Sequence, residues 1–505
     1  MSERLSAEHE QLGRVATEIV ARYARTLEEA RVCSEATPVE LEKMFDEPLP
    51  LEGSAALELF RRFERDIMPH AMNIPSPRYY GLFNPTPLPV AVWADALASA
   101  INQNGAVWRN SPSASVIEAR VLRWLCEIMG YGAESFGTLT SGGSEANLIA
   151  LKCARDRAAD FVRDRGLRAA PLSARRSVDA TTVPHTSQTA GNMIVYASEQ
   201  CHYSFVKSVD ILGLGRENLR KVATDERFHI DTDALRREIE RDLAAGNLPV
   251  CVAGAAGATS TGIIDPLDEL ADIAREYKLW FHVDAAYGGA LAMSDKYRGR
   301  LLGIERADSV TLDPHKWMFV PFAAGVVLVR DGGRVLRDGF DITPEYLSEE
   351  RGGEDVPFDF FRYGQLGTRR FNALKIWFAL KTLGTRGYAE IIERQIELTE
   401  YFAARVAALE GFECVGRVET ALCCLRFVPA EMRGADGTQL DALQRELQGR
   451  IERSGEAWFA TTVLHGRRAL RVNVNSFLTE RRHIDDLLEL LRRESVEVLK
   501  AREAL

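Results

Sequence analysis

Paired-cysteine motifs, long apolar runs and a basic excess are all absent from this sequence. None of its eight cysteines is spaced as CxxC, so neither a zinc site nor a disulfide framework is expected, and we predict reduced, mostly buried thiols. No apolar run approaches the roughly 20 residues that cross a bilayer. The first residues, Met1-Ser-Glu-Arg-Leu5, mix charges without the apolar core of a signal peptide. These absences predict a cytoplasmic protein that does not enter a membrane.

The charge balance limits the partners. With 73 acidic against 63 basic residues, the formal net charge is −10, which argues against a nucleic-acid-binding surface as the main function. The composition is otherwise that of a globular protein, with 46% hydrophobic and 27% charged residues. A chain of 505 residues is long enough for two or three domains with a large core.

Short apolar runs alternate with helical patterns between residues 138 and 330. Near-continuous apolar strands separated by amphipathic helices indicate an α/β fold, with a mostly parallel sheet covered on both faces. The expected strands are 193–197, 249–256, 280–285, 309–312 and 325–329, and the expected helices between them are 233–243 and 267–277. Ligands bind such sheets at the carboxyl ends of the strands.

The pattern changes on both sides of this region, which gives the domain boundaries. We predict an N-terminal helical arm with a pocket-lining segment over residues 1–115, a large domain over 116–385 and a smaller α+β domain over 386–505. The last domain is expected to contain strands 421–428 and 469–474 and helices 438–451 and 482–494. Residues 169–192 are small, polar and unpatterned, which predicts a surface insertion.

The stretch Asp313-Pro-His-Lys-Trp317 directly follows the expected strand 309–312. Lysine is seldom buried, and a neutral amine held in a pocket is the group that forms a Schiff base with an aldehyde. A surface lysine in a loop is the alternative, and five residues alone do not exclude it.

Three further strand ends carry polar motifs. Thr140-Ser-Gly-Gly-Ser-Glu-Ala-Asn147 leads into a helix whose N-terminal amides can hold a phosphate, although Ser144 could equally cap that helix. His202 is either a structural histidine or an imidazole stacked on a flat ring. Asp284 either caps a helix or meets a cation. A phosphate cradle, an acid for a pyridinium nitrogen and a Schiff-base lysine are the parts that pyridoxal phosphate needs.

In this order the motifs resemble those of the pyridoxal-phosphate group II amino-acid decarboxylases, which include the aromatic-amino-acid, histidine and glutamate decarboxylases. The resemblance covers most of the chain and is carried by 140–147, the His202 segment, His282-Val-Asp-Ala-Ala-Tyr-Gly288, 313–317 and Leu470-Arg-Val-Asn473. It implies fold type I, with an aminotransferase-like large domain. It also implies that an L-amino acid loses carbon dioxide, and Trp317 after the lysine favours an aromatic substrate.

The resemblance implies roles for individual residues as well. Lys316 is expected to carry the cofactor, Asp284 to pair with its pyridine nitrogen, and His202 to stack on its ring. Thr86 and Arg471 match substrate-side positions. The implied contacts with pyridoxal phosphate are Gly143, Ser144, His202, Ala258, Asp284, Ala286, Asp313, His315 and Lys316. Relatives are homodimers with sites at the interface, and no metal ion is implied.

One position departs from the family pattern. In relatives a tyrosine upstream of the Arg-Arg-Phe helix start delivers a proton to Cα, but alignment back from Phe371 places Phe360 there, with Tyr363 close by. A phenylalanine cannot donate a proton. Two products therefore stay open: the amine, or an aldehyde formed by oxidative decarboxylation and deamination.

The side chain of the substrate also stays open. Ala106 replaces a bulky pocket residue of aromatic-type relatives, and Arg109 nearby fits an acidic or polar substrate. A catalytically silent cofactor-binding protein is the remaining alternative. The joint presence of His202, Asp284 and Lys316 argues against it.

Overall fold

The computed structural model describes residues 2–167, 191–342 and 358–503. The predicted insertion at 169–192 lies almost wholly outside these ranges. The chain divides into two compact units, which are described separately. The first comprises Met1–Thr86, Glu397–Val415 and Leu422–Leu505, and the second comprises Pro87–Ile396 and Gly416–Ala421.

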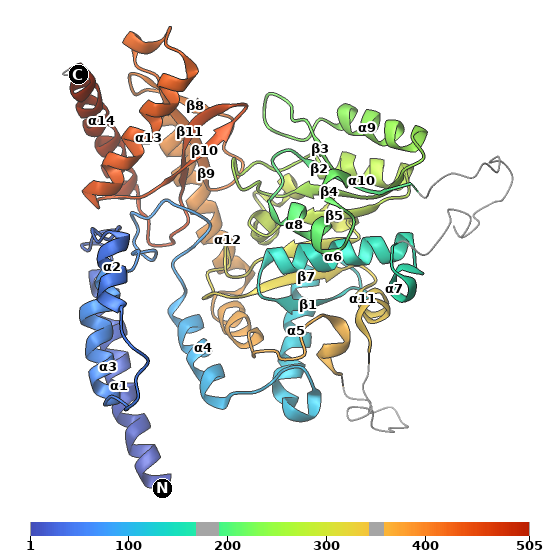
Figure 1. Ribbon diagram of the computed structural model, residues 1–505, viewed down its shortest axis with the longest axis horizontal. Helices are drawn as coiled ribbons and strands as arrows, with labels where there is room; N and C mark the ends of the chain where they lie inside the picture. The colour runs from blue at the N-terminus through green and yellow to red at the C-terminus, as the bar shows by residue number, and fades with distance from the viewer. Residues whose placement is uncertain (1, 168–190, 343–357, 504–505) are drawn as a thin grey trace, which may run out of the picture. The chain divides into compact units, whose positions relative to one another are not determined.

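The second unit contains a seven-stranded sheet in the order β1-β7-β6-β5-β4-β2-β3 (Figure 1). Its strands are β1 (Phe136–Thr140), β2 (Met193–Ser198), β3 (Leu219–Val222), β4 (Leu248–Ala255), β5 (Trp280–Asp284), β6 (Ser309–Leu312) and β7 (Gly325–Val329). The five strands expected from apolar runs are confirmed to within a residue or so. The mostly parallel α/β fold is confirmed too, because only β7 runs antiparallel to its neighbours in this sheet.

The antiparallel strand β7 has a consequence for the position of β1. Since β7 pairs antiparallel with both β1 and β6, β1 runs in the same direction as β6. The pairs β2–β4, β4–β5 and β5–β6 are parallel. The carboxyl ends of β1, β6, β5, β4 and β2 therefore share one edge of the sheet, which we call the carboxyl edge.

Two helices cover opposite faces of this sheet. On β4, Ala253 belongs to the same apolar cluster as Ala150 of α6, whereas a Cβ on the next residue, Gly254, would meet Leu267 and Leu270 of α10 at 2.9 and 2.8 Å. Because successive residues of a strand point to opposite faces, α6 and α10 lie on opposite sides of the sheet. Residues of β5 in register with Ala253 and Ala255 therefore face α6.

The helices of the second unit surround the strands in chain order. They are α4 (Pro89–Ile101), α5 (Pro112–Ile128), α6 (Gly143–Ala158), α7 (Val162–Arg165), α8 (Ser204–Ile211), α9 (Thr232–Ala244), α10 (Leu267–Glu276), α11 (Gly332–Phe340) and the first part of α12 (Ala373–Val406). The last of these changes direction at Gly384, whose φ of 62° is available to glycine at little cost.

The first unit has a four-stranded antiparallel sheet in the order β10-β11-β9-β8. Its elements are α1 (Ser2–Thr26), α2 (Pro38–Phe45), α3 (Ala56–Arg62), β8 (Phe412–Val415), β9 (Leu422–Phe427), α13 (Gly437–Ser454), β10 (Ala460–Leu464), β11 (Arg467–Asn473) and α14 (Arg481–Glu503). The predicted strands near 421–428 and 469–474 and both predicted C-terminal helices are present.

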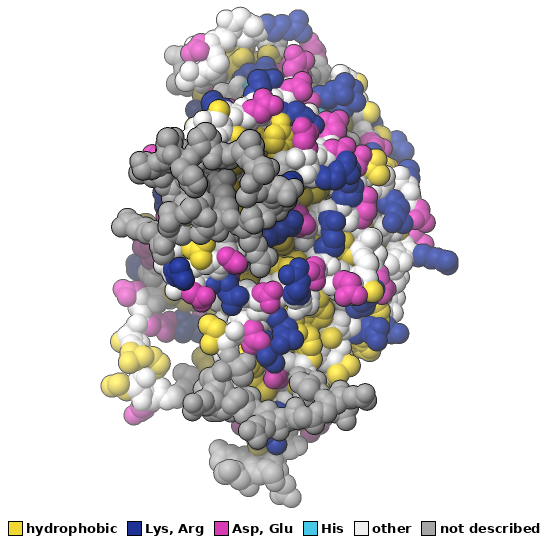
Figure 2. Space-filling view, turned by 90° about the vertical axis from the view of Figure 1, so that its right-hand side faces the viewer, with side chains coloured by type: hydrophobic (Ala, Val, Ile, Leu, Met, Phe, Trp, Pro, Cys, Tyr) yellow, Lys and Arg dark blue, Asp and Glu magenta, His cyan; other side chains and the backbone are white. Residues whose placement is uncertain are grey.

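The surface and the cysteines agree with the composition. Figure 2 shows basic and acidic side chains mixed across one face, with apolar side chains between them. Within the described ranges, the helices fall short of the length and apolar character needed to cross a bilayer. All eight cysteines are described, each is a free thiol, and six of them are buried.

Candidate active site

Lys316 lies in a tight turn at the carboxyl edge, just after β6. Its amide donates to Asp313 O at 2.8 Å, and its Nζ pairs with Asp313 Oδ2 at 2.9 Å. The next side chain, Trp317, is buried and donates from Nε1 to Gln395 Oε1 at 2.6 Å. The Lys316 side chain is only 20% exposed, so the surface-loop alternative is wrong.

Asp313 is almost fully buried beside this lysine. Its Oδ1 has no hydrogen-bond partner among the described residues, whereas its Oδ2 serves Lys316 and lies 3.7 Å from His315 Nε2. An unsatisfied buried oxygen is costly, and it marks a place where a ligand or water can complete the site.

The glycines before α6 meet the same turn. A Cβ on Gly143 would lie 2.9 Å from Asp313 Oδ2 and 3.3 Å from Ala286 Cβ, and a Cβ on Gly142 would lie 3.3 Å from His315 Cε1. The segments that follow β1, β5 and β6 therefore converge, and a side chain at position 143 would crowd the space between them.

The start of α6 leaves backbone donors at this point. Gly142 O accepts the first intrahelical bonds from the amides of Glu145 and Ala146, so the amides of Gly143 and Ser144 lie ahead of the helical ladder. Ser141 is held from its amide and hydroxyl by Glu145 Oε2. The helix has no side-chain N-cap, so a capping role for Ser144 is wrong. A helix start of this kind suits a phosphate.

Asp284 ends β5 with both carboxylate oxygens engaged. Oδ2 accepts from Asn147 Nδ2 at 2.9 Å, and Oδ1 accepts from the amide of Ala286 at 3.2 Å. The following short helix begins at Gly288 without a side-chain cap, so the N-cap alternative for Asp284 is wrong. Ala258 lies in the turn after the neighbouring strand β4 and is buried.

Two histidines flank these groups. His202, at the start of α8, contacts Ser204 Oγ through Nδ1 at 2.8 Å, and its ring lies 4.1 Å from that of Tyr203. Burial lowers the pKa of His202, the Asp284 and Asp313 carboxylates oppose this shift, and Lys316 adds to it. Burial also lowers the pKa of His315, whose Nδ1 lies 2.6 Å from Ala324 O.

Phe360 and Tyr363 lie in an aromatic cluster with Phe136 and Phe358. The ring of Phe360, which is fully buried, lies 6.1 Å from that of Phe136 and 4.8 Å from that of Phe358, and the Arg369 guanidinium lies 5.1 Å from its centre. Phe136 begins β1, whereas the phosphate cradle follows its other end, roughly 13 Å away at the usual rise per residue. The structure thus keeps this cluster apart from the carboxyl edge of the same chain.

The remaining predicted residues have other settings. Thr86 and Arg471 belong to the first unit, where both are buried: Thr86 Oγ1 donates to Pro75 O at 3.0 Å, and Arg471 Nη1 donates to Gly81 O at 2.9 Å. In the second unit Ala106 is buried, and its carbonyl accepts from the amide of Phe361, next to the aromatic cluster. Arg109 is exposed.

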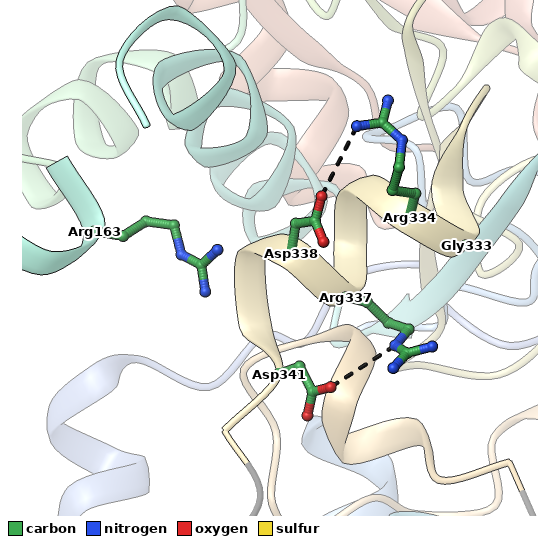
Figure 3. A pocket seen from close by; sticks show the side chains of 6 residues that line it. All are labelled: Arg163, Gly333, Arg334, Arg337, Asp338 and Asp341. Carbon is green, nitrogen blue, oxygen red and sulfur yellow. Dashed lines mark ion pairs between the residues drawn. The ribbon is translucent and has the colours of Figure 1, made fainter. Parts of the chain in front are cut away.

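A pocket elsewhere in the second unit has a different character (Figure 3). It is lined by Arg163, Gly333, Arg334, Arg337, Asp338 and Asp341. Arg334 pairs with Asp338 and Arg337 with Asp341, at 3.8 and 3.7 Å. Surface arginines neutralised in this way provide neither a nucleophile nor a proton carrier, so the carboxyl edge is the candidate active site.

Sequence reasoning missed the side chains that support this edge. Asn147, His282, Ser309 and Thr311 are buried and hydrogen-bonded to one another or to Asp284. One signal was available for His282, because it precedes Asp284 by two residues in a strand and so shares its face. Asn147 stands within the quoted glycine-rich motif, but its partners are distant in the sequence.

Comparison with known proteins gives this geometry a family. The profile described as "Pyridoxal-dependent decarboxylase conserved domain" matches residues 38–428. The chain belongs to this family. It is therefore a pyridoxal-phosphate-dependent enzyme of the carboxy-lyase class, as the sequence motifs predicted.

Individual relatives of this decarboxylase differ in their substrates. An aromatic-L-amino-acid decarboxylase of Bacillus atrophaeus is 30% identical over 93% of this chain and 92% of that protein. An acidic amino acid decarboxylase of Xenopus tropicalis is 31% identical over 80% of this chain and 75% of that protein. The crystal structure of mouse CSAD, 28% identical, superposes with a TM-score of 0.88 over 97% of this chain and 99% of that one.

Proposed function

We propose that this decarboxylase converts an L-amino acid with an aromatic side chain into the amine and carbon dioxide, using the residues of the carboxyl edge. One observation carries the proposal. The glycines before α6, the Asp313–Lys316 pair and Asp284 meet at a single point, with His202 close enough to feel their charges. An amine, a phosphate-sized donor cradle and an acid are thus arranged around one space.

Pyridoxal phosphate fits this space by the chemistry of its lining. When bound, it supplies an aldehyde for a lysine amine and a ring that draws electrons from the bond to be broken. Lys316 Nζ would hold the aldehyde carbon, and the Gly143 and Ser144 amides would receive the phosphate. The contacts proposed to complete the site are Ala258, Ala286, Asp313 and His315.

Two residues are assigned to the ring itself. Asp284 would keep a proton on the pyridine nitrogen, since an ionised carboxylate stabilises a neighbouring cation. His202 would stack on the ring and direct a ring nitrogen toward the substrate carboxylate. Thr86 and Arg471 are proposed as substrate contacts, because a buried guanidinium is the group that pairs best with a carboxylate.

Replacing Lys316 by alanine tests this assignment. The variant should lose the visible absorbance of bound cofactor, and carbon dioxide release should fall by at least about a thousandfold, because no other amine replaces the nucleophile. Lys43→Ala, on the exposed helix α2, is the matched control and should keep both signals. A Lys316→Ala protein that keeps the coloured complex would exclude Lys316 as the carrier. A wild-type protein that binds the cofactor without releasing carbon dioxide from any amino acid would be the silent binder.

The aromatic side chain is proposed from two exposed rings beside the site. Tyr203 is 60% exposed next to His202, and Phe322 is 52% exposed with its ring 4.7 Å from that of His315. Exposed apolar rings favour an aromatic ligand over an acidic one. Carbon dioxide release from L-tryptophan, L-tyrosine and L-phenylalanine should exceed release from L-glutamate and L-aspartate. The reverse order would support the acidic alternative, for which Arg109 would be the cation.

The second candidate product is an aldehyde, formed with oxygen as oxidant and with release of ammonia and hydrogen peroxide. Its case rested on Phe360, which is buried in the aromatic cluster, so we propose the amine. Tyr346 and Tyr363 are the two tyrosines between Lys316 and Arg369, and Tyr346 lies outside the described residues. Quantifying amine, aldehyde and peroxide separates the two products, and peroxide in proportion to carbon dioxide would favour the aldehyde.

Assembly and location follow from the family resemblance and the thiols. We propose a homodimer, which light scattering would report as twice the chain mass of 56.2 kDa. A cytoplasmic location is proposed from the reduced cysteines. A monomer with full activity would contradict the first proposal, and recovery outside the cytoplasm on cell fractionation would contradict the second.

A further inference from the structure

Asn147 makes four hydrogen bonds at the centre of the carboxyl edge. It is 1% exposed, in the second turn of α6. Its Nδ2 donates to Asp284 Oδ2 at 2.9 Å and to Ser204 Oγ at 3.0 Å. Its Oδ1 accepts from Thr311 Oγ1 at 2.7 Å and from His282 Nε2 at 3.0 Å. Both amide hydrogens and both lone pairs are thereby used.

The orientation of this amide follows from its charged partner. An ionised carboxylate only accepts hydrogen bonds, so the group that faces Asp284 must be the NH2 end. The carbonyl oxygen then faces Thr311 and His282, which must both donate to it. The hydrogen of His282 therefore lies on Nε2.

The branch through His282 is consistent with this assignment. His282 Nδ1 lies 2.8 Å from Ser309 Oγ, and that oxygen accepts from Trp280 Nε1 at 2.8 Å, so the serine hydrogen is available to Nδ1. Burial lowers the pKa of His282 to about 4, which keeps the ring neutral at neutral pH.

The branch through Ser204 reaches His202. Ser204 Oγ accepts from Asn147 and lies 2.8 Å from His202 Nδ1. The backbone amide of Ser204 also donates to Nδ1, at 3.3 Å, and the hydrogen of a backbone amide has a fixed position. His202 Nδ1 must therefore be an acceptor, so the hydrogen of the neutral ring lies on Nε2.

We propose that Asn147, acting through Ser204, is a positioning residue that fixes His202 as its Nε2–H tautomer while it orients the Asp284 carboxylate. One amide thus sets the hydrogen positions of the two groups assigned above to the ring of pyridoxal phosphate. The inference rests on the proposed function for the meaning of these positions, but the tautomer is a property of the protein itself.

Nitrogen NMR of isotope-labelled histidine in the holoenzyme reads the tautomer directly. In the wild type, the His202 signal, assigned from its loss in His202→Asn, should show hydrogen on Nε2 and none on Nδ1. Asn147→Leu removes the amide at similar volume, and Ser204→Ala removes the relay hydroxyl. Both variants should shift the His202 nitrogens toward a mixture of tautomers, and Asn147→Leu should weaken pyridoxal-phosphate binding by roughly tenfold.

Ile149→Val is the matched control on the same helix. Ile149 is 2% exposed and contributes apolar packing alone, so this variant disturbs α6 without removing a hydrogen bond. It should leave the His202 signal unchanged. If Asn147→Leu fails to fold, Ser204→Ala carries the test.

Two results would overturn the inference: hydrogen on Nδ1 of His202 in the wild type, or an unchanged His202 signal in folded Ser204→Ala and Asn147→Leu proteins. Either result leaves the Lys316 assignment intact. Conversely, if Lys316→Ala retains the coloured complex, the proposed function fails while the tautomer of His202 remains measurable.

Discussion

The two ends of strand β1 differ in how their surroundings are held. After its carboxyl end, donors and acceptors from α6, β5 and the turn after β6 meet with defined partners, and Asn147 alone makes four hydrogen bonds. At its amino end, Phe136 packs with Phe358, Phe360 and Tyr363 through ring contacts of 4.4 to 6.1 Å. Directed bonds fix proton positions, whereas ring packing mainly buries area. We therefore expect the two ends to separate chemistry from stability.

Arg369 connects the two ends. Its guanidinium lies over the Phe360 ring, pairs with buried Glu118, and donates from Nη1 to Thr138 Oγ1 at 3.1 Å in the middle of β1. Burial raises the pKa of Glu118, and the charge of Arg369 opposes that shift. A buried ion pair of this kind fixes an arrangement more than it adds stability.

The largest effect should follow from emptying the aromatic cluster. Phe360→Ala removes a fully buried ring and should lower the free energy of unfolding by about 3–5 kcal/mol. The folded fraction should keep its rate of carbon dioxide release, because the cavity lies away from the carboxyl edge. Chemical denaturation and assays on the same preparations measure both quantities. Leu302→Ala, at a 64% exposed position, is the control, and a rate loss larger than the folded fraction explains would break the separation.

Asp284→Asn should show the opposite behaviour. The amide keeps the shape of the carboxylate but not its charge, so the rate of decarboxylation should fall roughly 10²- to 10³-fold. The free energy of unfolding should change little, because an asparagine oxygen can still accept from Asn147. Steady-state kinetics and thermal unfolding decide the matter, with the exposed Asp295→Asn as control. Full activity of Asp284→Asn would contradict the assignment.

His282 should make the carboxyl edge sensitive to acid. Burial lowers its pKa to about 4 from 6.5, so the neutral ring stabilises the folded state above pH 6.5, and this stability is lost as the pH falls through about 4. Relative to His282→Gln, the wild type should lose up to about 3 kcal/mol across that range. Denaturation curves at several pH values measure the difference. Parallel curves for the two proteins would exclude a buried neutral His282.

The smallest effect should come from Phe360→Tyr. A hydroxyl without a partner in the aromatic cluster should cost about 1–3 kcal/mol in the free energy of unfolding. The product should stay the same, since the ring lies away from the reacting atoms. Amine and aldehyde measured before and after the change give the answer. A switch of product would show that Phe360 reaches an active site after all.

The strands were predictable where burial alone decides them. The runs that became β2, β4, β5, β6 and β7 are apolar and almost wholly buried. Strands β1 and β3 escaped prediction because Thr138 and Thr140 are polar although buried, and β3 is short with a partly exposed middle. Tertiary pairing determines such segments more than their own composition does.

The candidate site was predictable for a similar reason. A parallel sheet brings the ends of its strands to one edge, so Lys316, Asp284, Gly143 and His202 could be expected near one another before their geometry was known. The amide network around Asn147 could not be predicted, because its partners come from distant segments. Phe360 shows the opposite case, since its place beside the Arg-Arg-Phe start gave no sign of its burial.

The central claim is that Lys316 carries pyridoxal phosphate at the carboxyl edge. Reduction of the holoenzyme with borohydride fixes the cofactor on the amine that holds it, and peptide mapping then identifies that residue. We expect one label per chain, on the peptide that contains Lys316, and none there in Lys316→Ala. A label on another lysine, such as Lys207 or Lys375, or a stoichiometric complex without any label, would contradict the account.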